Sequence, residues 1–437
     1  MSEKEQKKDK KANVPKLRFP GFTEPWEQRR LGEAFINLQN NTLSRAELSS
    51  GEGKVKNVHY GDLLVIFSEV LNVKKEELPT IKDESIISKY KESFLKNGDI
   101  VMADTAEDET VGKCTEIEGL TEEIVISGLH TIPYRPQSKF APRYLGYYLN
   151  SAYYHDQLLP LTQGIKVSSI SKTSLKSTYI SYPKSLVEQG KIGNFFNYLD
   201  HLITLHQRKL DDLKKLKKGL LQKMFPKNGE KVPELRFPGF KNDWEQRKLS
   251  EVATMHARIG WQNLRTSEFL DSGDYMLITG TDFNDGAINY STCHFVERER
   301  YEQDKHIQIK NGSILITKDG TLGKVAYVQG LSIPATLNAG VFNVEIKDET
   351  EIDNKYLFQY LKAPFLMDYV DKKATGGTIK HLNQNILVDF PVLMPSKTEQ
   401  EAIGVYFERL DNLITLHQRK LDHLKELKKG LLQQMFV

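Results

Sequence analysis

The stretch that decides the fold is residues 202–225, which read LITLHQRKLDDLKKLKKGLLQKMF. Nearly the same residues return at 413–436 as LITLHQRKLDHLKELKKGLLQQMF. In both copies the apolar residues recur every three or four positions, which is the pattern of an amphipathic helix with one apolar face. Lysine, arginine, aspartate and glutamine occupy the other face. Each copy therefore predicts a long helix, over 199–224 and 410–435.

Each predicted helix has an apolar stripe that is too strong to leave in water, and the other helix is its obvious partner. If both halves of the chain adopt the same fold, a pseudo-twofold axis relates them and the two helices run antiparallel. A helix of 26 residues at about 1.5 Å per residue is roughly 39 Å long, which suits a spacer better than a core element. The leucines expected to make the helix pairing are Leu202, Leu210, Leu213, Leu220, Leu413, Leu421, Leu424 and Leu431.

A second repeated segment precedes each half of the chain. The residues LRFPGFTEPWEQRRLGE (17–33) return as LRFPGFKNDWEQRKLSE (235–251), whereas only fragments of the interiors align, such as KNGDIV (96–101) with KNGSIL (310–315). Preserved ends around dissimilar middles indicate one scaffold that presents two different specificities. Simple drift of a duplicated domain is the alternative explanation.

The two interiors predict mixed α+β domains. Residues 98–117 and 312–328 contain short β-rich runs of the kind that form hairpins. Residues 141–159 and 353–370 have aromatic and leucine spacing near 3.6, which is typical of a helix, and their aromatic residues Tyr147, Tyr153, Tyr356 and Phe365 are expected in the core.

The expected fold class is therefore α+β, with two mixed α/β domains separated by two long antiparallel helices and an internal pseudo-twofold repeat. The expected organisation is a basic flexible tail at 1–16, a first domain at 17–184, a spacer helix at 185–226, a linker at 227–234, a second domain at 235–395 and a second spacer helix at 396–437.

Composition sets the broad class. The 437 residues carry a formal net charge of +3, which does not by itself indicate a nucleic-acid binder. The two cysteines, Cys114 and Cys293, do not correspond between the halves, which argues against a disulfide framework or zinc site and favours a reducing cytoplasm. The sequence has no apolar run long enough to span a membrane and no signal-peptide pattern at its start. A cytoplasmic location is expected.

Motifs of catalysis are missing. GTLGKV (320–325) lacks the spacing of a phosphate-binding loop and reads as a hairpin arm. The acidic cluster at 107–109 has no counterpart in the other half, so a solvated loop tip is a better interpretation than a metal site. A stand-alone enzyme is therefore disfavoured, and no metal site is expected.

The order of variable domain, repeated helix, variable domain and repeated helix resembles the specificity subunit of type I restriction-modification systems. The resemblance rests on the LRFPGF…WEQR segments, on NGSILITKDGTLGKVAYV (311–328) and on the LITLHQRKL…LKKGLLQ helices. It implies that each interior is a target-recognition domain that reads one half of a split, asymmetric DNA sequence. The helices would pair as a ruler that sets the gap and would dock two methyltransferase subunits.

The resemblance also implies what the chain does not do. It would have no active site, and would serve a complex that methylates adenine in double-stranded DNA and, with restriction/translocase subunits, cuts unmethylated DNA. S-adenosylmethionine, ATP and Mg²⁺ would belong to the partner subunits, and no cofactor is expected in this chain.

Residues that contact DNA are expected in the polar loops after the interior helices and in the hairpins, because base reading needs amide, hydroxyl and basic side chains. The expected DNA-binding residues are Lys113, Thr162, Gln163, Lys166, Ser168, Ser169, Lys172, Lys318, Thr321, Lys324, Thr375, Gly376, Gly377, Thr378, Lys380, His381 and Asn383. The alternative function is a two-domain coiled-coil scaffold that recruits proteins without recognising DNA.

Overall fold

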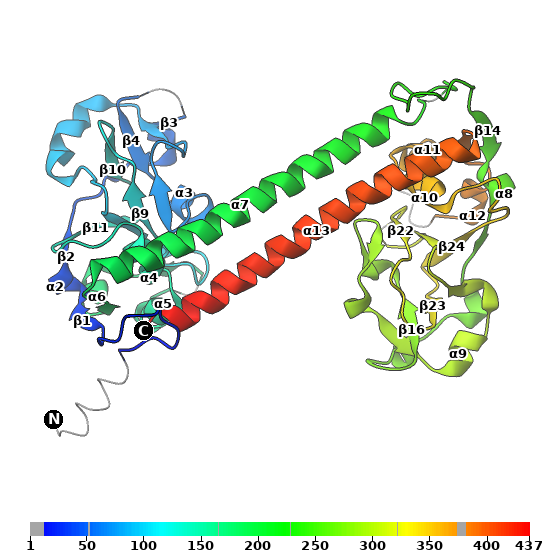
Figure 1. The fold of residues 1–437 in the computed structure, drawn as a ribbon. Coiled ribbons are helices and arrows are strands. Elements are labelled where there is room, and N and C mark those ends of the chain that lie inside the picture. Colours follow the sequence, from blue (N-terminus) through cyan, green and yellow to red (C-terminus); the bar gives the residue numbers. More distant parts are fainter. Residues whose placement is uncertain (1–12, 51–52, 165, 228, 321, 374–381) are drawn as a thin grey trace. The chain divides into compact units, whose positions relative to one another are not determined.

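The computed structural model describes residues 13–50, 53–164, 166–227, 229–320, 322–373 and 382–437 (Figure 1). The chain divides into two compact units. Unit 1 is the chain up to Gln207 together with Arg419–Val437, and unit 2 is Arg208–Gln418. Each unit therefore contains half of each long helix, whereas the sequence-based boundaries assigned each helix as a whole to a separate spacer.

The two long helices are α7 (Leu186–Lys223) and α13 (Lys397–Met435), of 38 and 39 residues. Both begin about a dozen residues before the apolar segments 199–224 and 410–435 and next to the expected spacer bounds 185 and 396, because the apolar pattern continues backwards through Ile192 and Phe196, which are both buried. At about 1.5 Å per residue, each is closer to 57 Å long than to the expected 39 Å. Pro226 follows α7 and prevents its continuation.

Two ion pairs show that the helices run antiparallel. Asp200 of α7 pairs with Lys428 of α13 at 2.6 Å within unit 1, and Lys217 pairs with Asp411 at 2.5 Å within unit 2. Between these pairs α7 advances by 17 residues while α13 goes back by the same number. The pairs are also copies of each other, since Asp200 and Lys217 correspond to Asp411 and Lys428 in the repeat. The internal repeat and the antiparallel helices predicted from the sequence are confirmed.

The leucines expected to pair the helices differ in burial. Leu210 and Leu421 are 2% and 1% exposed, whereas Leu413 is 43% exposed and its neighbour Ile414 is buried instead. The remaining five, Leu202, Leu213, Leu220, Leu424 and Leu431, are partly buried. Of these, Leu213 and Leu220 pack against the core of unit 2, and Leu424 and Leu431 against that of unit 1. The stripe thus contacts the domain cores as well as the other helix.

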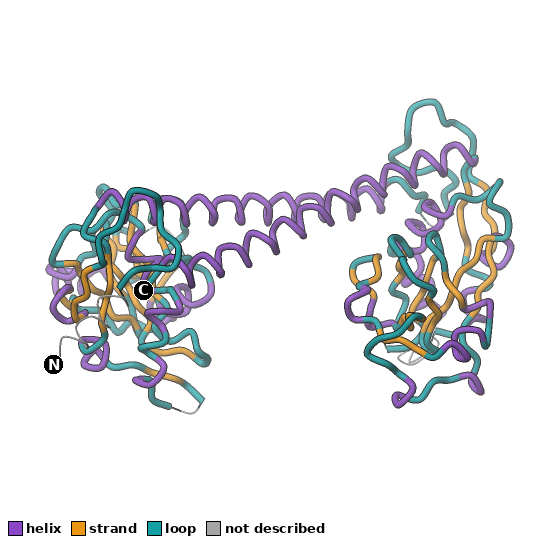
Figure 2. Tube along the Cα trace, turned by 60° about the horizontal axis from the view of Figure 1, so that its bottom comes forward, coloured by secondary structure: helices purple, strands orange, loops and turns teal. Residues whose placement is uncertain are grey.

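Unit 1 is built on two sheets, whose strands are orange in Figure 2. In the described residues the larger has the order β2-β11-β7-β9-β5, with bounds Phe35–Asn37, Thr131–Pro136, Ile100–Ala103, Cys114–Glu118 and Val70–Asn72. The smaller has the order β10-β4-β6-β3, with bounds Ile124–Ser127, Val55–Val58, Thr80–Ile81 and Leu48–Ser49. Two short pairs complete it: β1 (Glu27–Arg30) with β13 (Tyr179–Tyr182), and β8 (Thr105–Ala106) with β12 (Ser168–Ser169).

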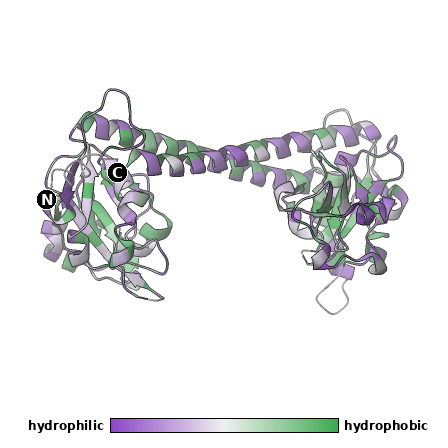
Figure 3. Ribbon diagram, turned by 90° about the horizontal axis from the view of Figure 1, so that it is seen from below, coloured by the Kyte–Doolittle hydropathy of each residue, from purple (hydrophilic) through white to green (hydrophobic). Residues whose placement is uncertain are grey.

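Five short helices accompany these sheets in the described residues of unit 1. They are α2 (Leu31–Ala34), α3 (Tyr60–Val65), α4 (Tyr144–Leu149), α5 (Ala152–His155) and α6 (Lys172–Lys176). The hairpin expected at 98–117 is confirmed, because β7 and β9 pair antiparallel. The strands inside the unit are largely green in Figure 3, since runs such as IVMA in β7 are buried on both faces.

Unit 2 repeats this plan with different lengths. Its described sheets are β15-β24-β21-β22, with bounds Ala253–His256, Val341–Ile346, Ile314–Thr317 and Val325–Tyr327, and β19-β16-β23-β20, with bounds His294–Val296, Tyr275–Ile278, Ala335–Leu337 and Gln308–Ile309. The short pairs are β14 (Glu245–Lys248) with β25 (Pro391–Met394), and β17 (Phe283–Asn284) with β18 (Ala287–Ile288). Its helices are α8 (Leu249–Val252), α9 (Arg298–Glu302), α10 (Asn354–Lys362), α11 (Phe365–Lys373) and α12 (Gln384–Leu387). The hairpin expected at 312–328 is confirmed by the antiparallel pairing of β21 with β22.

Two predicted helices are each interrupted, which corrects the sequence-based expectation. Residues 141–159 form α4 and α5, because Ser151 between them accepts a hydrogen bond from the backbone of Tyr154 and starts a new helix. Residues 353–370 form α10 and α11, which Pro364 separates. Tyr153, expected in the core, is 36% exposed, whereas Tyr147 and Tyr356 are buried.

Each unit has a joint where the two long helices enter it. Joint 1 consists of residues 13–26, the start of α7 and the end of α13, whose red ribbon lies near α5 in Figure 1. There Phe436 is buried against Trp26, Tyr144 and Phe196. The backbone N–H of Leu17 donates to the carbonyl oxygen of Gln434 at 2.9 Å, which satisfies a carbonyl in the last turn of α13.

Joint 2 repeats joint 1 with residues 231–244, the end of α7 and the start of α13. Phe225 takes the place of Phe436 and contacts Trp244, Tyr356 and Phe407. The N–H of Leu235 donates to the carbonyl of Lys223 at 2.8 Å. In both joints an arginine pairs with a carboxylate that is 1% exposed: Arg18 with Glu188 at 2.6 Å, and Arg236 with Glu399 at 2.7 Å.

Candidate DNA interface

Edge 1 is a group of loops in unit 1 that meet where β4, β7 and β10 end. The backbone N–H of Asp104, after β7, donates to the carbonyl of His130, between β10 and β11, at 3.1 Å. The N–H of Ile170 donates to the carbonyl of Asp104 at 2.8 Å, which attaches the loop 162–172 to the same place. Loops that converge on the ends of strands in this way commonly carry binding residues.

Four of the residues expected to bind DNA lie together at edge 1. Gln163 and Ser169 exchange two backbone hydrogen bonds of 2.9 and 2.8 Å, and Ser168 and Ser169 pair with β8. Lys172 begins α6, and its Nζ donates to Oδ1 of Asn40 at 3.2 Å. These are the amide, hydroxyl and ammonium groups that DNA recognition uses.

The loop that carries these residues turns at Gly164. Its φ of 112° is outside the range of most side chains, and a Cβ there would lie 1.9 Å from the carbonyl oxygen of Val167. Lys166 and Val167 are both exposed beyond the turn. Thr162 precedes it and donates its hydroxyl to the carbonyl of Leu159 at 2.8 Å.

The backbone of Lys113 lies at edge 1, because its carbonyl oxygen accepts the N–H of Ala103, the last residue of β7, at 2.8 Å. Its Nζ donates to the carbonyl oxygen of Leu64 at 2.8 Å, and burial lowers the pKa of its ammonium group. The ammonium is therefore engaged with the backbone of α3, and a contact of Lys113 with DNA stays a prediction that this geometry does not support.

Edge 2 is the corresponding group of loops in unit 2. The N–H of Lys318, after β21, donates to the carbonyl of Gly340 at 2.8 Å, and the N–H of Leu382 donates to the carbonyl of Lys318 at 2.8 Å. The exposed Asn383 follows at the start of α12. Lys324 is exposed, and its backbone N–H donates to Oγ1 of Thr317 at 3.0 Å. Edge 2 thus brings together Lys318, Lys324 and Asn383, each of them expected to bind DNA.

Seven of the expected residues lie outside the part of the chain that the structure describes. They are Thr321, Thr375, Gly376, Gly377, Thr378, Lys380 and His381.

The two edges are fixed by different buried polar side chains, which lie in the loop after β2 in unit 1 and in the loop after β15 in unit 2. In unit 1, Asn41 donates to Oδ1 of Asn57 at 3.1 Å and to the carbonyl of Ser127 at 2.9 Å. In unit 2, Arg258 is 1% exposed and donates to the carbonyl of Leu337 at 3.0 Å, and burial lowers the pKa of its guanidinium group. Both side chains hold the loop after the first sheet strand against the strand ends, so each edge has a defined shape.

Sequence reasoning missed several polar residues of the edges. Unit 1 contributes Asn40, Tyr60, Thr105 and His130, and unit 2 contributes Thr279, Thr281 and Asn338. Each lies at or next to the end of a strand, so its position was visible in the pattern. Only the sheet order brings these loops together, and one sequence does not reveal that order.

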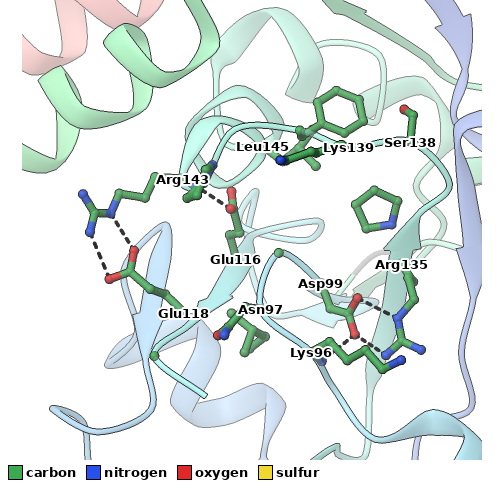
Figure 4. A pocket seen from close by; sticks show the side chains of 16 residues that line it. Lys96, Asn97, Asp99, Glu116, Glu118, Arg135, Ser138, Lys139, Arg143 and Leu145 are labelled. Atoms are coloured by element: carbon green, nitrogen blue, oxygen red, sulfur yellow. Dashed lines mark hydrogen bonds and ion pairs between the residues drawn. The ribbon is translucent and has the colours of Figure 1, made fainter. Parts of the chain in front are cut away.

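A pocket of about 600 Å³ lies at the opposite end of the larger sheet of unit 1 (Figure 4). Two ion pairs line it, Arg135 with Asp99 at 2.6 Å and Arg143 with Glu118 at 2.5 Å. Glu116 accepts the backbone N–H of Arg143 at 2.6 Å and thereby caps α4, and burial raises its pKa to about 7. These charges stabilise the fold beneath α4. None of the residues expected to bind DNA lines the pocket.

The described residues contain no group of three or more histidine, cysteine, aspartate or glutamate side chains placed to hold a metal ion. Among the described helices, none combines the length and the apolar character that a membrane crossing demands.

The chain belongs to the family described as the type I restriction modification DNA specificity domain, whose model matches residues 23–215 and 241–426. The two matches cover both copies of the repeat.

Similar proteins bear specificity-subunit names. Over 434 residues the chain is 23% identical to a putative type I restriction enzyme MjaX specificity subunit of Methanocaldococcus jannaschii, covering 98% of this chain and 96% of that protein. It is 24% identical over 284 residues to the MjaVIII specificity subunit of the same organism, covering 63% of this chain but only 65% of that protein.

Solved structures share the fold. The crystal structure of the S subunit of a type I restriction-modification system from M. genitalium has a TM-score of 0.62 and 16% identity, covering 97% of this chain and 99% of that chain. A chain from a structure describing complex assembly and conformational transition of the type I system has a TM-score of 0.50 and 17% identity, with the same coverage.

Proposed function

We propose that this chain is the DNA specificity subunit of a type I restriction-modification complex, and that units 1 and 2 each read one half of a bipartite, asymmetric DNA target. The observation that carries the proposal is the relation between the edges. Both are built by the same backbone contacts, yet they present different side chains, such as Asp104 and Thr105 at edge 1 against Lys318 and Asp319 at edge 2. One scaffold with two unlike surfaces suits a target with two unlike halves. Membership of a DNA specificity family favours this function over a protein scaffold.

The paired helices would set the gap between the half-sites. Successive major grooves on one face of DNA recur about every 34–36 Å, so recognition domains joined by rigid helices favour a fixed spacing. The two ion pairs, Asp200 with Lys428 and Lys217 with Asp411, fix the register of α7 against α13.

The helices also offer two equivalent surfaces for partner subunits. Leu205 and Leu216 of α7 are 38% and 49% exposed, and their counterparts Leu416 and Leu427 of α13 are 45% and 40% exposed. Exposed leucines on a helix face suit a protein interface. Because the repeat supplies the same surface twice, it supports docking of two methyltransferase subunits, one at each copy.

Catalysis would belong to these partners. The methyltransferase subunits would bind S-adenosylmethionine and modify adenine, and the restriction/translocase subunits would use ATP and Mg²⁺. The small net charge of +3 suits a chain that binds DNA weakly alone and tightly within a complex. The complex would act in the cytoplasm.

Single-molecule methylome sequencing tests the proposal. The chain is co-expressed with its methyltransferase subunits in a host without other adenine methylation. The expected result is one modified motif with two different halves and a fixed gap. Sequence-independent methylation, or a complex that methylates no DNA, contradicts the proposal.

A paired insertion tests the role of the helices. One helical turn is added between Asp200 and Lys217 and another between Asp411 and Lys428, which preserves both ion pairs. We expect both half-sites to be kept and the gap to lengthen. If the gap is unchanged while both half-sites are still read, the helices do not set the spacing between the half-sites.

A further inference from the structure

We infer that His130 is a base-contacting residue of edge 1 that determines which sequence unit 1 reads, an inference that rests on the proposed function. It lies between β10 and β11 and was not among the residues expected from the sequence. Three observations support it: its backbone conformation, the partners of its ring, and the groups around it.

The backbone of His130 is in the left-handed region, with φ of 53°. Among the described residues only Arg143 and Asp285 share this feature outside glycine, and both have structural explanations. Arg143 precedes α4 and pairs with Glu118, and Asp285 precedes Gly286 in the turn between β17 and β18. A strained backbone is kept where the surroundings hold it and, commonly, where function uses it.

The neighbours of the His130 ring fix its orientation. Nδ1 lies 3.4 Å from Oγ1 of Thr105 and 3.4 Å from Oδ1 of Asp104. The hydroxyl hydrogen of Thr105 is already donated to Asp104 at 2.8 Å, so both oxygens near Nδ1 act as acceptors. Nδ1 therefore carries a hydrogen, and in the neutral ring Nε2 is left as an acceptor. Tyr60 packs edge-on against the ring at 5.2 Å.

The acceptor Nε2 is available to a ligand. The side chain of His130 is 46% exposed, and its Nε2 forms no hydrogen bond with any described residue. In the major groove the hydrogen-bond donors of the bases are the exocyclic amino groups, N6 of adenine and N4 of cytosine. We therefore expect His130 to read adenine or cytosine at one position of one half-site.

The rest of edge 1 suits this role. Lys172 and Asn40 lie in the same group of loops, where an ammonium group near the bases can contact a phosphate. In unit 2 the segment between β23 and β24 is Asn338, Ala339 and Gly340, without histidine. Loss of the His130 side chain should therefore affect one half-site only.

The test uses the complete complex with its methyltransferase subunits and a panel of DNA duplexes. Once the wild-type motif is known, each duplex carries one base substitution in one half-site. The variant His130→Gly removes the ring but tolerates the left-handed backbone. The position of His130 is occupied by Gly340 in unit 2, so the comparison variant there is Asn338→Ala in the same segment, which should leave the half-site read by unit 1 unchanged.

Methylation rates decide the outcome. With His130→Gly we expect the preference for adenine or cytosine at one position of one half-site to fall about tenfold, with all other positions unchanged. Unchanged preferences overturn the inference, and so does an equal but partial loss of rate on every duplex, because a purely structural role has that effect.

A second variant keeps the inference testable if His130→Gly is inactive. If His130→Gly methylates no duplex, His130→Asn is used, since asparagine tolerates the same backbone conformation. Altered preference at one position supports the inference, and unchanged preference or renewed complete loss overturns it. A wild-type complex without any sequence preference refutes the proposed function instead, which separates the two failures.

Discussion

Joint 1 and joint 2 are nearly identical, whereas edge 1 and edge 2 are not. The difference follows from what each region contacts. A joint combines the N-terminal arm of one copy with the helix end of the other copy, as when Leu17 binds Gln434 and Leu235 binds Lys223. A change in either helix end must therefore suit the arm of the opposite copy. The residues of an edge contact only their own unit, so each edge is free to differ.

The joints do differ at one point. Lys428 in joint 1 pairs with two carboxylates, Glu69 at 2.7 Å and Asp200 at 2.6 Å. Burial opposes its charge, but the two carboxylates raise its pKa above the ordinary value. Among the described residues, its counterpart Lys217 forms an ion pair with Asp411 alone. Burial and the neighbouring Lys362 lower the pKa of Lys217 to about 8.

The largest expected effect comes from removing the buried phenylalanine ring at either joint. Phe436→Ala and Phe225→Ala each remove a buried ring, and we expect each to lower the free energy of unfolding by about 3–5 kcal/mol. Hydrogen exchange should show weaker protection in unit 1 for Phe436→Ala and in unit 2 for Phe225→Ala. The exposed Leu427→Ala is the control. If Phe436→Ala weakened protection in unit 2 instead, or Phe225→Ala in unit 1, the assignment of each helix end to its joint would be wrong.

The next effect distinguishes the two lysines. Lys428→Met leaves two partly buried carboxylates, Glu69 and Asp200, without a cation, which should lower the free energy of unfolding by about 2 kcal/mol. Lys217→Met leaves only Asp411, whose side chain is 29% exposed, and removes repulsion with Lys362, so about 1 kcal/mol or less is expected at pH 7. Urea denaturation measures both. Equal losses would show that the joints are electrostatically alike.

A pH series sharpens this contrast. Because the pKa of Lys217 is about 8 when folded and about 10.4 when unfolded, the unfolded state binds more protons between these values. The contribution of Lys217 to the free energy of unfolding therefore rises with pH between these two pKa values. The free-energy gap between wild type and Lys217→Met should shift in favour of wild type by about 1–2 kcal/mol from pH 7 to pH 9.5. A gap independent of pH would contradict the lowered pKa.

The smallest effect concerns the edges. Lys172→Ala and Lys318→Ala should each weaken binding of DNA by the complex several-fold and reduce the salt dependence by about one counterion. Lys74→Ala, at the other end of the sheet in unit 1, is the exposed control. If the control weakens binding equally, these lysines contribute only general charge.

Sequence patterns revealed the elements that depend on local periodicity. The two long helices and the hairpins of β7 with β9 and β21 with β22 followed from spacing and turn residues. The break at Pro364 was visible but not used. The joints were not predictable, because the burial of Phe436 in unit 1 depends on contacts across more than 200 residues. His130 was missed for the same reason, since strand order alone brings it to Asp104 and Thr105.

The exchange of helix ends also affects the order of folding during synthesis. The two pieces of unit 1 are separated by the 211 residues of unit 2, which are continuous. A ribosome therefore releases residues 13–207 long before the segment 419–437, and until then Trp26 and Phe196 lack the ring of Phe436. We expect unit 2 to close first, although it is made second. A chain interrupted before residue 419 would lack Phe436, so unit 1, which is translated first, would be the unit left incomplete.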